Sequence, residues 1–353
     1  MEKISTAKWI LVTGGTGFVG IHTILQLIQK GYKVKTTIRS LVKKEDVLDM
    51  LAKGGITMPA DLCFIEADLT KDANWDEAVK DCEYVHHIAS PIGLSIPKSE
   101  EEMIRPAVDG TIRVLRAAKK AGVKRVIMTS NFGAVGYSHK DHSQLITEES
   151  WTDPNEKGLS AYNKSKVLAE RAAWEFINRE GGGLELVVTN PMGIFGPALG
   201  ADLSSGFQLL KNILDGSMKA LPKLTLGLVD VRDVADLHIR AMTSPQAAGQ
   251  RFLALAGGTM SLPQIARLLR LQRPQLATRV SSKTLPDWMV RLSAPFNSRA
   301  RAIAPMLGIN RNASNEKARR ILGWQPRSNE EAILASVESL AEFHPIPNIE
   351  GGK

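Results

Sequence analysis

A glycine-rich turn near the N-terminus constrains this chain more than any other feature. The apolar run 9–12 (Trp-Ile-Leu-Val) leads directly into residues 13–20 (Thr-Gly-Gly-Thr-Gly-Phe-Val-Gly), and a helical pattern follows. Glycines here let the backbone turn tightly, and the next helix offers an anion its unpaired N–H groups and its positive dipole end. Because the turn lies between a strand and a helix, we interpret it as dinucleotide-binding rather than as an ordinary β–α turn. The residues predicted to bind the dinucleotide are Gly14, Thr16, Gly17, Phe18, Val19 and Gly20.

The elements that follow extend this unit into a parallel sheet. Up to residue 190, short apolar runs alternate with helical patterns. Such alternation indicates βαβ units, and continuously apolar strands indicate a sheet that is covered on both faces. The predicted fold class is α/β, with a Rossmann-type doubly wound parallel sheet. Strands are expected at 9–12, 33–38, 62–66, 83–88, 125–128 and 184–189, and helices at 18–30, 43–53, 104–121 and 160–178.

The rhythm changes after Pro191, where the expected loops lengthen and Pro and Gly are irregularly spaced. The segments 229–233 and 252–255 are expected to return to the main sheet. A chain of 353 residues suits a large α/β unit with a smaller annex. We therefore predict two interleaved domains. A Rossmann domain for the dinucleotide comprises 1–190 plus 229–256, and a smaller C-terminal substrate-binding subdomain comprises 191–228 plus 257–345.

The end of the strand at 33–38 distinguishes between two dinucleotides. A carboxylate there would bind the ribose 2′-hydroxyl of NAD. The strand instead ends in Arg39, with Lys43 just beyond, and no carboxylate occurs before Glu45. A guanidinium can pair with a 2′-phosphate through two hydrogen bonds. The sequence therefore predicts NADP(H), with Arg39 as the main contact and Lys43 beside it; a solvated loop arginine is the alternative.

Three further strand ends are predicted to border the cofactor, because ligands of such sheets bind at the carboxyl ends of the strands. The position after the third strand often lies against the adenine ring, although Asp68 could instead cap the following turn. Small residues after the fourth strand would let the cofactor lie close. The predicted residues at these ends are Asp68, Leu69, Ala89, Ser90, Pro91 and Thr129.

A tyrosine and a lysine begin the helix after the fifth strand. Tyr162 and Lys166 are four residues apart, so both lie on one face of that helix. A phenol normally titrates near pH 10, and a neighbouring ammonium favours its ionised form. The phenol could then donate a proton to a carbonyl oxygen, or accept one in the reverse direction, near neutral pH. An ordinary amphipathic helix with a surface Tyr and Lys is the alternative.

Charge and composition argue against other kinds of partner. The net charge is +8, but the basic residues are spread along the chain and there are only four Tyr, so nucleic-acid binding is not expected. His86 and His87 are adjacent and lack further ligands at suitable spacing, so no metal site is predicted. We expect a small carbonyl or alcohol compound as the substrate.

The location is predicted from what the chain lacks. The first apolar run is too short for a signal peptide, and no run approaches the roughly 18 apolar residues of a membrane-spanning helix. Cys63 and Cys82 stand in no metal or redox spacing and are expected to be reduced thiols. A cytoplasmic protein without a membrane segment is therefore expected.

These features together resemble an extended short-chain dehydrogenase/reductase of the NAD-dependent epimerase/dehydratase superfamily. Within it, the chain is most similar, over nearly its full length, to the dihydroflavonol reductase-like and aldehyde reductase-like branch. The resemblance implies that Pro191 borders the nicotinamide and that a homodimer is possible. The matching features are residues 13–20, Arg39, Tyr162 with Lys166, Asn190-Pro191, Val231-x-Asp233-Val234-Ala235, and the run 314–328 with Leu-Gly-Trp-Gln-Pro at 322–326.

The chain departs from the family pattern at one catalytic position. The family places a Ser or Thr after the fifth strand to hydrogen-bond the substrate carbonyl, and here the sequence reads Thr129-Ser130-Asn131. By register the hydroxyl position is Asn131. Either its amide polarises the carbonyl, which is chemically adequate, or Ser130 takes the role after a local shift. Sequence reasoning leaves both open.

The resulting hypothesis is an NADP(H)-dependent carbonyl reductase or alcohol dehydrogenase. Hydride would pass between NADPH and a ketone or aldehyde, with Tyr162 as proton donor and Lys166 tuning it. A nucleotide-sugar epimerase or dehydratase is one alternative, although such enzymes usually keep NAD and Arg39 argues against that. A catalytically inactive NADP-sensing binding protein is the other alternative, because Asn131 stands where the family places a catalytic Ser or Thr.

Overall fold

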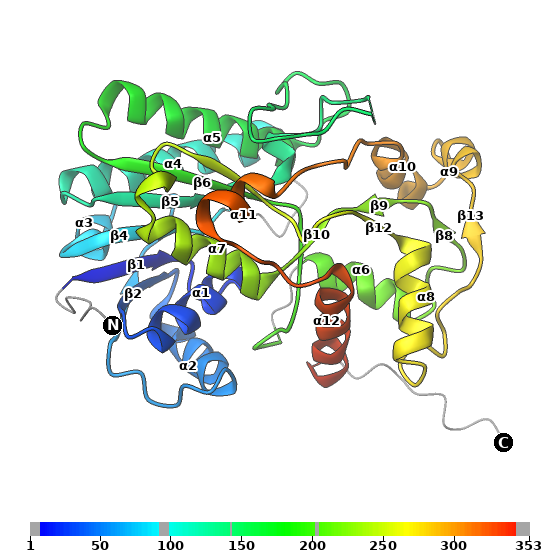
Figure 1. Cartoon of the computed structure of the whole chain (residues 1–353), viewed down its shortest axis with the longest axis horizontal. Coiled ribbons are helices and arrows are strands. Elements are labelled where there is room, and N and C mark those ends of the chain that lie inside the picture. The colour runs from blue at the N-terminus through cyan, green and yellow to red at the C-terminus, as the bar shows by residue number, and fades with distance from the viewer. Residues whose placement is uncertain (1–7, 92–98, 142, 202–204, 344–353) are drawn as a thin grey trace.

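A computed structural model describes residues 8–91, 99–141, 143–201 and 205–343 (Figure 1). Its centre is a seven-stranded sheet in the order β11-β6-β5-β4-β1-β2-β3, and every neighbouring pair is parallel. The strand order reverses between β1 and β4, the position where doubly wound sheets bind ligands. The predicted fold class is therefore confirmed. The strands are β1 Trp9–Thr13, β2 Lys33–Ile38, β3 Leu62–Glu66, β4 Cys82–His87, β5 Arg125–Thr129, β6 Glu185–Pro191 and β11 Arg251–Ala254.

Helices cover both faces of this sheet, as its continuously apolar strands require. On one face α1 packs against α7, and the apolar side chains of α1, α2 and α7 form one buried cluster with β1 and β2. On the other face α4 packs against α5 and covers a second cluster with α3. These helices are α1 Phe18–Gln29, α2 Lys44–Lys53, α3 Trp75–Val79, α4 Glu101–Lys120, α5 Ala161–Glu180 and α7 Val231–Thr243.

The C-terminal part builds a third apolar core beside the sheet. Phe207, Ile265 and Ile333 contribute to it from α6, α8 and α12, and Figure 1 shows α6, α8, α9, α10 and α12 gathered at one end of the molecule. The helices are α6 Ser205–Leu214, α8 Leu262–Gln272, α9 Asp287–Ser293, α10 Ser298–Ile303, α11 Glu316–Leu322 and α12 Asn329–Phe343. Short strand pairs join them: β7 Gly193–Phe195 with β10 Leu228–Asp230, β9 Thr225–Leu226 with β12 Met260–Ser261, and β8 Leu221–Pro222 with β13 Thr284–Leu285.

Short 3-10 helices complete the described elements. They are η1 Leu41–Lys43, η2 Phe132–Ala134, η3 Pro245–Ala247 and η4 Ala304–Met306. Of these, η2 directly follows the Ser130-Asn131 segment, which is predicted to contact the substrate carbonyl.

Of the two segments predicted to return to the main sheet, 229–233 and 252–255, only the second is confirmed. Residues 251–254 do join it as β11 beside β6, but 229–233 do not. Leu228–Asp230 pairs with β7 instead, and the chain then turns into α7, because the Asp230 carboxylate caps that helix by accepting from Arg232 N at 2.9 Å. The helix α3 was not expected at all. The domain boundaries stay a prediction.

Candidate active site

One cavity of about 1520 Å³ collects the carboxyl ends of six strands of the main sheet. Every predicted site residue except Lys43 lines it. Lys43 lies on η1, where its ammonium pairs with Asp46 at 2.8 Å. The predicted residues around the cavity are Gly14, Thr16, Gly17, Phe18, Val19, Gly20, Arg39, Asp68, Leu69, Ala89, Ser90, Pro91, Thr129, Ser130, Asn131, Tyr162, Lys166 and Pro191.

The glycine turn is close-packed at two positions. Gly14 has φ +76°, and a Cβ there would lie 3.1 Å from the Cβ of Ala89. A Cβ on Gly20 would lie 2.2 Å from the carbonyl oxygen of Gly14, so only glycine fits. Gly17 precedes α1 without a side-chain cap, which leaves the first N–H groups of that helix available to an anion. The local backbone therefore suits a pyrophosphate.

A threonine that sequence reasoning did not select holds the neighbouring strand end in place. The Thr13 hydroxyl accepts from Ile88 N at 3.0 Å and from Ala89 N at 2.9 Å, and lies 3.3 Å from His87 Nδ1. It thus fixes the small residues after β4 against the glycine turn. No sequence pattern marks this role, because the two segments are 75 residues apart.

At the end of the cavity that is predicted to hold the adenine, Arg39 is exposed at the end of β2 and Asp68 follows β3. The Asp68 carboxylate accepts from both the N and the Oγ1 of Thr70 at 2.8 Å. These hydrogen bonds lower the pKa of Asp68 and keep it ionised. Asp68 therefore does cap the following turn, as the alternative interpretation held, and it also lines the cavity.

Tyr162 and Lys166 lie near the start of α5. Ser160 caps this helix by accepting from Asn163 N at 3.2 Å. The Lys166 side chain is buried, its Nζ lies 5.8 Å from the Tyr162 ring centroid, and Tyr162 is 36% exposed. Within the described chain, the Lys166 ammonium makes no hydrogen bond to another residue, which leaves it available to hydroxyl groups of a cofactor.

Ser130 and Asn131 differ in their accessibility. The Ser130 hydroxyl oxygen is buried and lacks a hydrogen-bond partner among the described residues, and the Ser130 residue is 2% exposed. Asn131 is half-buried, in extended backbone before η2, and its Oδ1 is also buried without a hydrogen-bond partner among the described residues. Gly133 leaves room for this amide and for that of Asn163, because a Cβ on Gly133 would lie 2.8 and 2.3 Å from their Oδ1 atoms. Asn163, which sequence reasoning missed, also lines the cavity.

A buried polar network supports this segment from behind. Glu170 on α5 is fully buried and pairs with Arg251 Nε on β11 at 2.6 Å. Asn190 Nδ2 on β6 donates to Glu170 at 2.8 Å and to the carbonyl oxygen of Asn131 at 3.2 Å. The network links three elements to the backbone of Asn131. Its hydrogen-bonded pairs are 20 to 81 residues apart in sequence, so no local motif could reveal it.

The buried histidines have structural environments. His86 and His87 lie within β4, and His238 of α7 contacts the hydroxyls of Thr129 at 3.1 Å and Thr189 at 2.7 Å. Burial lowers the pKa of both His87 and His238 to about 3. Within the described residues, His, Cys, Asp and Glu side chains form no group of three or more that could hold a metal ion.

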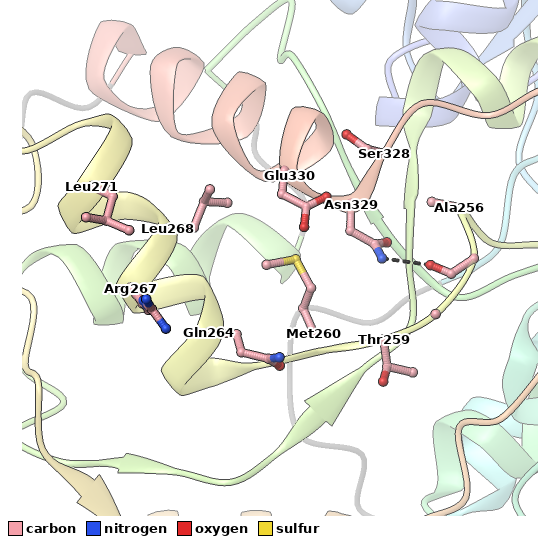
Figure 2. A pocket seen from close by; sticks show the side chains of 12 residues that line it. Ala256, Thr259, Met260, Gln264, Arg267, Leu268, Leu271, Ser328, Asn329 and Glu330 are labelled. Carbon is pink, nitrogen blue, oxygen red and sulfur yellow. Dashed lines mark hydrogen bonds between the residues drawn. The ribbon is translucent and has the colours of Figure 1, made fainter.

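A second, smaller cavity of about 540 Å³ lies between α8 and the start of α12 (Figure 2). None of the predicted residues lines it. The Asn329 amide donates to the carbonyl oxygen of Gly257 across its mouth at 2.9 Å, and Gln264 completes the capping box of α8 with Ser261. Asn329 and Gln264 thus serve local structure. No helix in the described chain has the length and apolarity needed to cross a bilayer.

The sheet, the glycine turn and the common cavity define a Rossmann-type dinucleotide-binding protein. Residues 10–254 match the model of the NAD dependent epimerase/dehydratase family, and the chain belongs to this family. The resemblance predicted from the sequence is thereby confirmed.

Named relatives cover most of the chain. It is 31% identical to the ketoreductase azaE of Aspergillus niger, with 96% of this chain and 99% of that protein covered. It is 32% identical to an anthocyanidin reductase of Vitis vinifera, covering 76% and 82% of the two chains. The crystal structure of yeast methylglyoxal/isovaleraldehyde reductase Gre2 complexed with NADPH has a TM-score of 0.77 and 28% identity, covering 95% and 98%.

Proposed function

We propose that the protein is an NADP(H)-dependent oxidoreductase that reduces the carbonyl group of a ketone or aldehyde, or oxidises the matching alcohol. The observation that carries this proposal is the convergence of Tyr162, Lys166 and Asn131 in the cavity that also holds the glycine turn and Arg39. Relatives named as reductases, and the NADPH complex of the yeast enzyme, support both the activity and the cofactor predicted from the sequence.

The residues present fit this cofactor. The turn from Gly14 to Gly20 suits the pyrophosphate, and Arg39 suits the 2′-phosphate. Asp68 and Leu69 would border the adenine, Lys166 would bind the nicotinamide ribose, and Pro191 would border the nicotinamide. A bound NADPH supplies the hydride.

The chain's own side chains then handle the carbonyl oxygen. The Tyr162 hydroxyl donates its proton to that oxygen as negative charge develops there. The Asn131 amide donates a hydrogen bond to the same oxygen. We assign this role to Asn131 rather than to Ser130, because Asn131 is half-buried whereas Ser130 is 2% exposed, and both residues line the cavity. The Lys166 ammonium, next to the phenol ring, favours the transfer by stabilising the phenolate.

The first experiment measures consumption of NADPH, with NADH in parallel, against a panel of aliphatic and aromatic aldehydes and ketones. Turnover with NADPH preferred is the expected result. Tight NADPH binding without any turnover would instead favour the NADP-sensing protein, and Asn131→Ser would then be the variant to test for recovered activity.

We also propose a division of roles between the two parts of the chain, a cellular location and an oligomeric state. The main sheet with its helices would bind the cofactor, and the C-terminal helices would contact the substrate. A cytoplasmic location is proposed because Cys63 and Cys82 are free thiols. A homodimer is proposed from the family resemblance, and light scattering of the purified protein tests it.

A further inference from the structure

A buried guanidinium lines the active-site cavity without a carboxylate partner among the described residues. Arg311 is 8% exposed and contributes to the cavity wall. Its Nη2 donates to the Tyr137 hydroxyl at 3.3 Å, and its Nε is buried with no hydrogen-bond partner in the described chain. Three carboxylates line the same cavity, Asp68, Glu102 and Glu156, and none forms an ion pair with Arg311.

The nearby charges do not neutralise this guanidinium. Glu156 pairs with Lys140 at 2.9 Å, and Asp68 hydrogen-bonds to Thr70 at the adenine end. Arg301 on α10, which also lines the cavity, is exposed and donates to the backbone carbonyls of Ala294 and Pro295. Burial of an unpaired cation costs free energy, so an anion supplied by a ligand would be bound strongly here.

Arg311 lies against two aromatic side chains that line the same cavity. Its guanidinium carbon is 5.5 Å from the ring centroid of Phe132 and 4.8 Å from that of Tyr137. Phe132 directly follows Asn131, the residue assigned to the carbonyl oxygen. A small molecule whose carbonyl meets Asn131 could therefore place a second group against Arg311, with an aryl ring packed on the two aromatic side chains.

The chain holds Arg311 in place from both sides. The fully buried Asn310 donates through Nδ2 to the carbonyl oxygens of Asp141 at 2.7 Å and Gln144 at 3.0 Å. On the other side, Ile146 N donates to Asn312 O at 2.8 Å. A fixed segment presents the guanidinium without further ordering cost, as expected of a binding group.

We propose that Arg311 binds a carboxylate of the substrate, so that the preferred substrates are aldehydes or ketones that also carry a carboxylate. This inference rests on the proposed function, since it names the substrate class of the same site. A planar guanidinium can bind a carboxylate through two parallel hydrogen bonds, which also fixes the position of the carbonyl.

Binding to the full chain saturated with NADP⁺ tests the inference without requiring turnover. The probes are 4-(hydroxymethyl)benzoate and its methyl ester, which resemble reaction products and differ in charge. We expect calorimetry to give roughly 10- to 100-fold tighter binding of the carboxylate. Arg311→Met should remove this preference, and Arg311→Lys should keep part of it. Arg116→Met, which removes an exposed charge on α4 outside the cavity, should keep all of it.

Equal affinity of the parent protein for acid and ester would overturn the inference, whether or not Arg311→Met folds. A preference that persists in a folded Arg311→Met variant would overturn it too. Turnover of 4-formylbenzoate and its methyl ester with NADPH separates the two proposals. If neither is reduced while the carboxylate preference in binding remains, the reductase function fails and the Arg311 assignment stands. If both are reduced equally well and no preference in binding exists, the Arg311 assignment fails and the reductase function stands.

Discussion

At the scale of single residues, the proposed carbonyl reduction depends most on Tyr162. Replacing it with Phe removes one oxygen and leaves the helix and the lysine in place. We expect kcat for aldehyde reduction to fall by roughly 10² to 10⁴-fold, because general acid catalysis is lost, while NADPH affinity changes little. Tyr32→Phe is the control, since Tyr32 does not line the cavity. Steady-state kinetics and a fluorescence titration provide the two values; parent-like turnover by Tyr162→Phe would exclude it as the proton donor.

The proposed contact of Arg39 with the 2′-phosphate is tested by comparing NADPH with NADH as the cofactor. Arg39→Ala should raise the KM for NADPH by about 10-fold or more, through loss of a charge-assisted contact, and leave that for NADH nearly unchanged. Lys43→Ala should have a smaller effect, because the Lys43 ammonium pairs with Asp46 and does not line the cavity. Equal losses with both cofactors in Arg39→Ala would indicate a general structural role rather than contact with the 2′-phosphate.

At the scale of elements, the buried pair of Glu170 and Arg251 joins α5 to β11 behind the catalytic segment. Glu170→Gln leaves a buried guanidinium without its counter-ion, and we expect the free energy of unfolding to fall by about 3–5 kcal/mol. Glu175→Gln on the same helix breaks an exposed pair with Arg179 and should cost less than about 1 kcal/mol. Urea denaturation compares the two variants; equal small losses would show that the buried pair contributes little.

The helices, strands and site residues also differ in whether they could be predicted from the sequence. The strands at 33–38 and 62–66 have the predicted bounds, because apolar runs between turn residues report burial directly. The glycine turn, Arg39 and the Tyr162–Lys166 pair could be found because each is encoded within a few neighbouring residues. Thr13, Asn163, Glu170 and Arg311 could not, since their roles arise from contacts between distant segments. The prediction for 229–233 was wrong because its strand, Leu228–Asp230, pairs with β7 rather than with the main sheet, and Asp230 then caps α7.

At the scale of the whole molecule, acid should unfold the protein through its buried histidines. The pKa of His87 and that of His238 are lowered to about 3, so both stay neutral when folded and bind protons near pH 6.5 when unfolded. The contribution of the two neutral histidines to the free energy of unfolding is therefore fully present above about pH 6.5. It is lost as the pH decreases from 6.5 towards 3. Each histidine should contribute about 1.4 kcal/mol per pH unit between pH 6 and pH 5. Urea titrations at several pH values should give a shallower slope for His238→Gln; an unchanged slope would refute this assignment.

The central claim, that the protein transfers hydride from NADPH to a carbonyl carbon, is tested most directly with NADPH deuterated at C4 of the nicotinamide. The protein is incubated with an aldehyde that it consumes, and the alcohol product is analysed by mass spectrometry. Two labelled forms of NADPH are compared, each with deuterium at one of the two C4 positions. Hydride transfer predicts that one of these forms delivers one deuterium to the carbinol carbon for each NADPH oxidised. Alcohol formed without deuterium from either labelled form, or NADPH oxidised without alcohol, would contradict it.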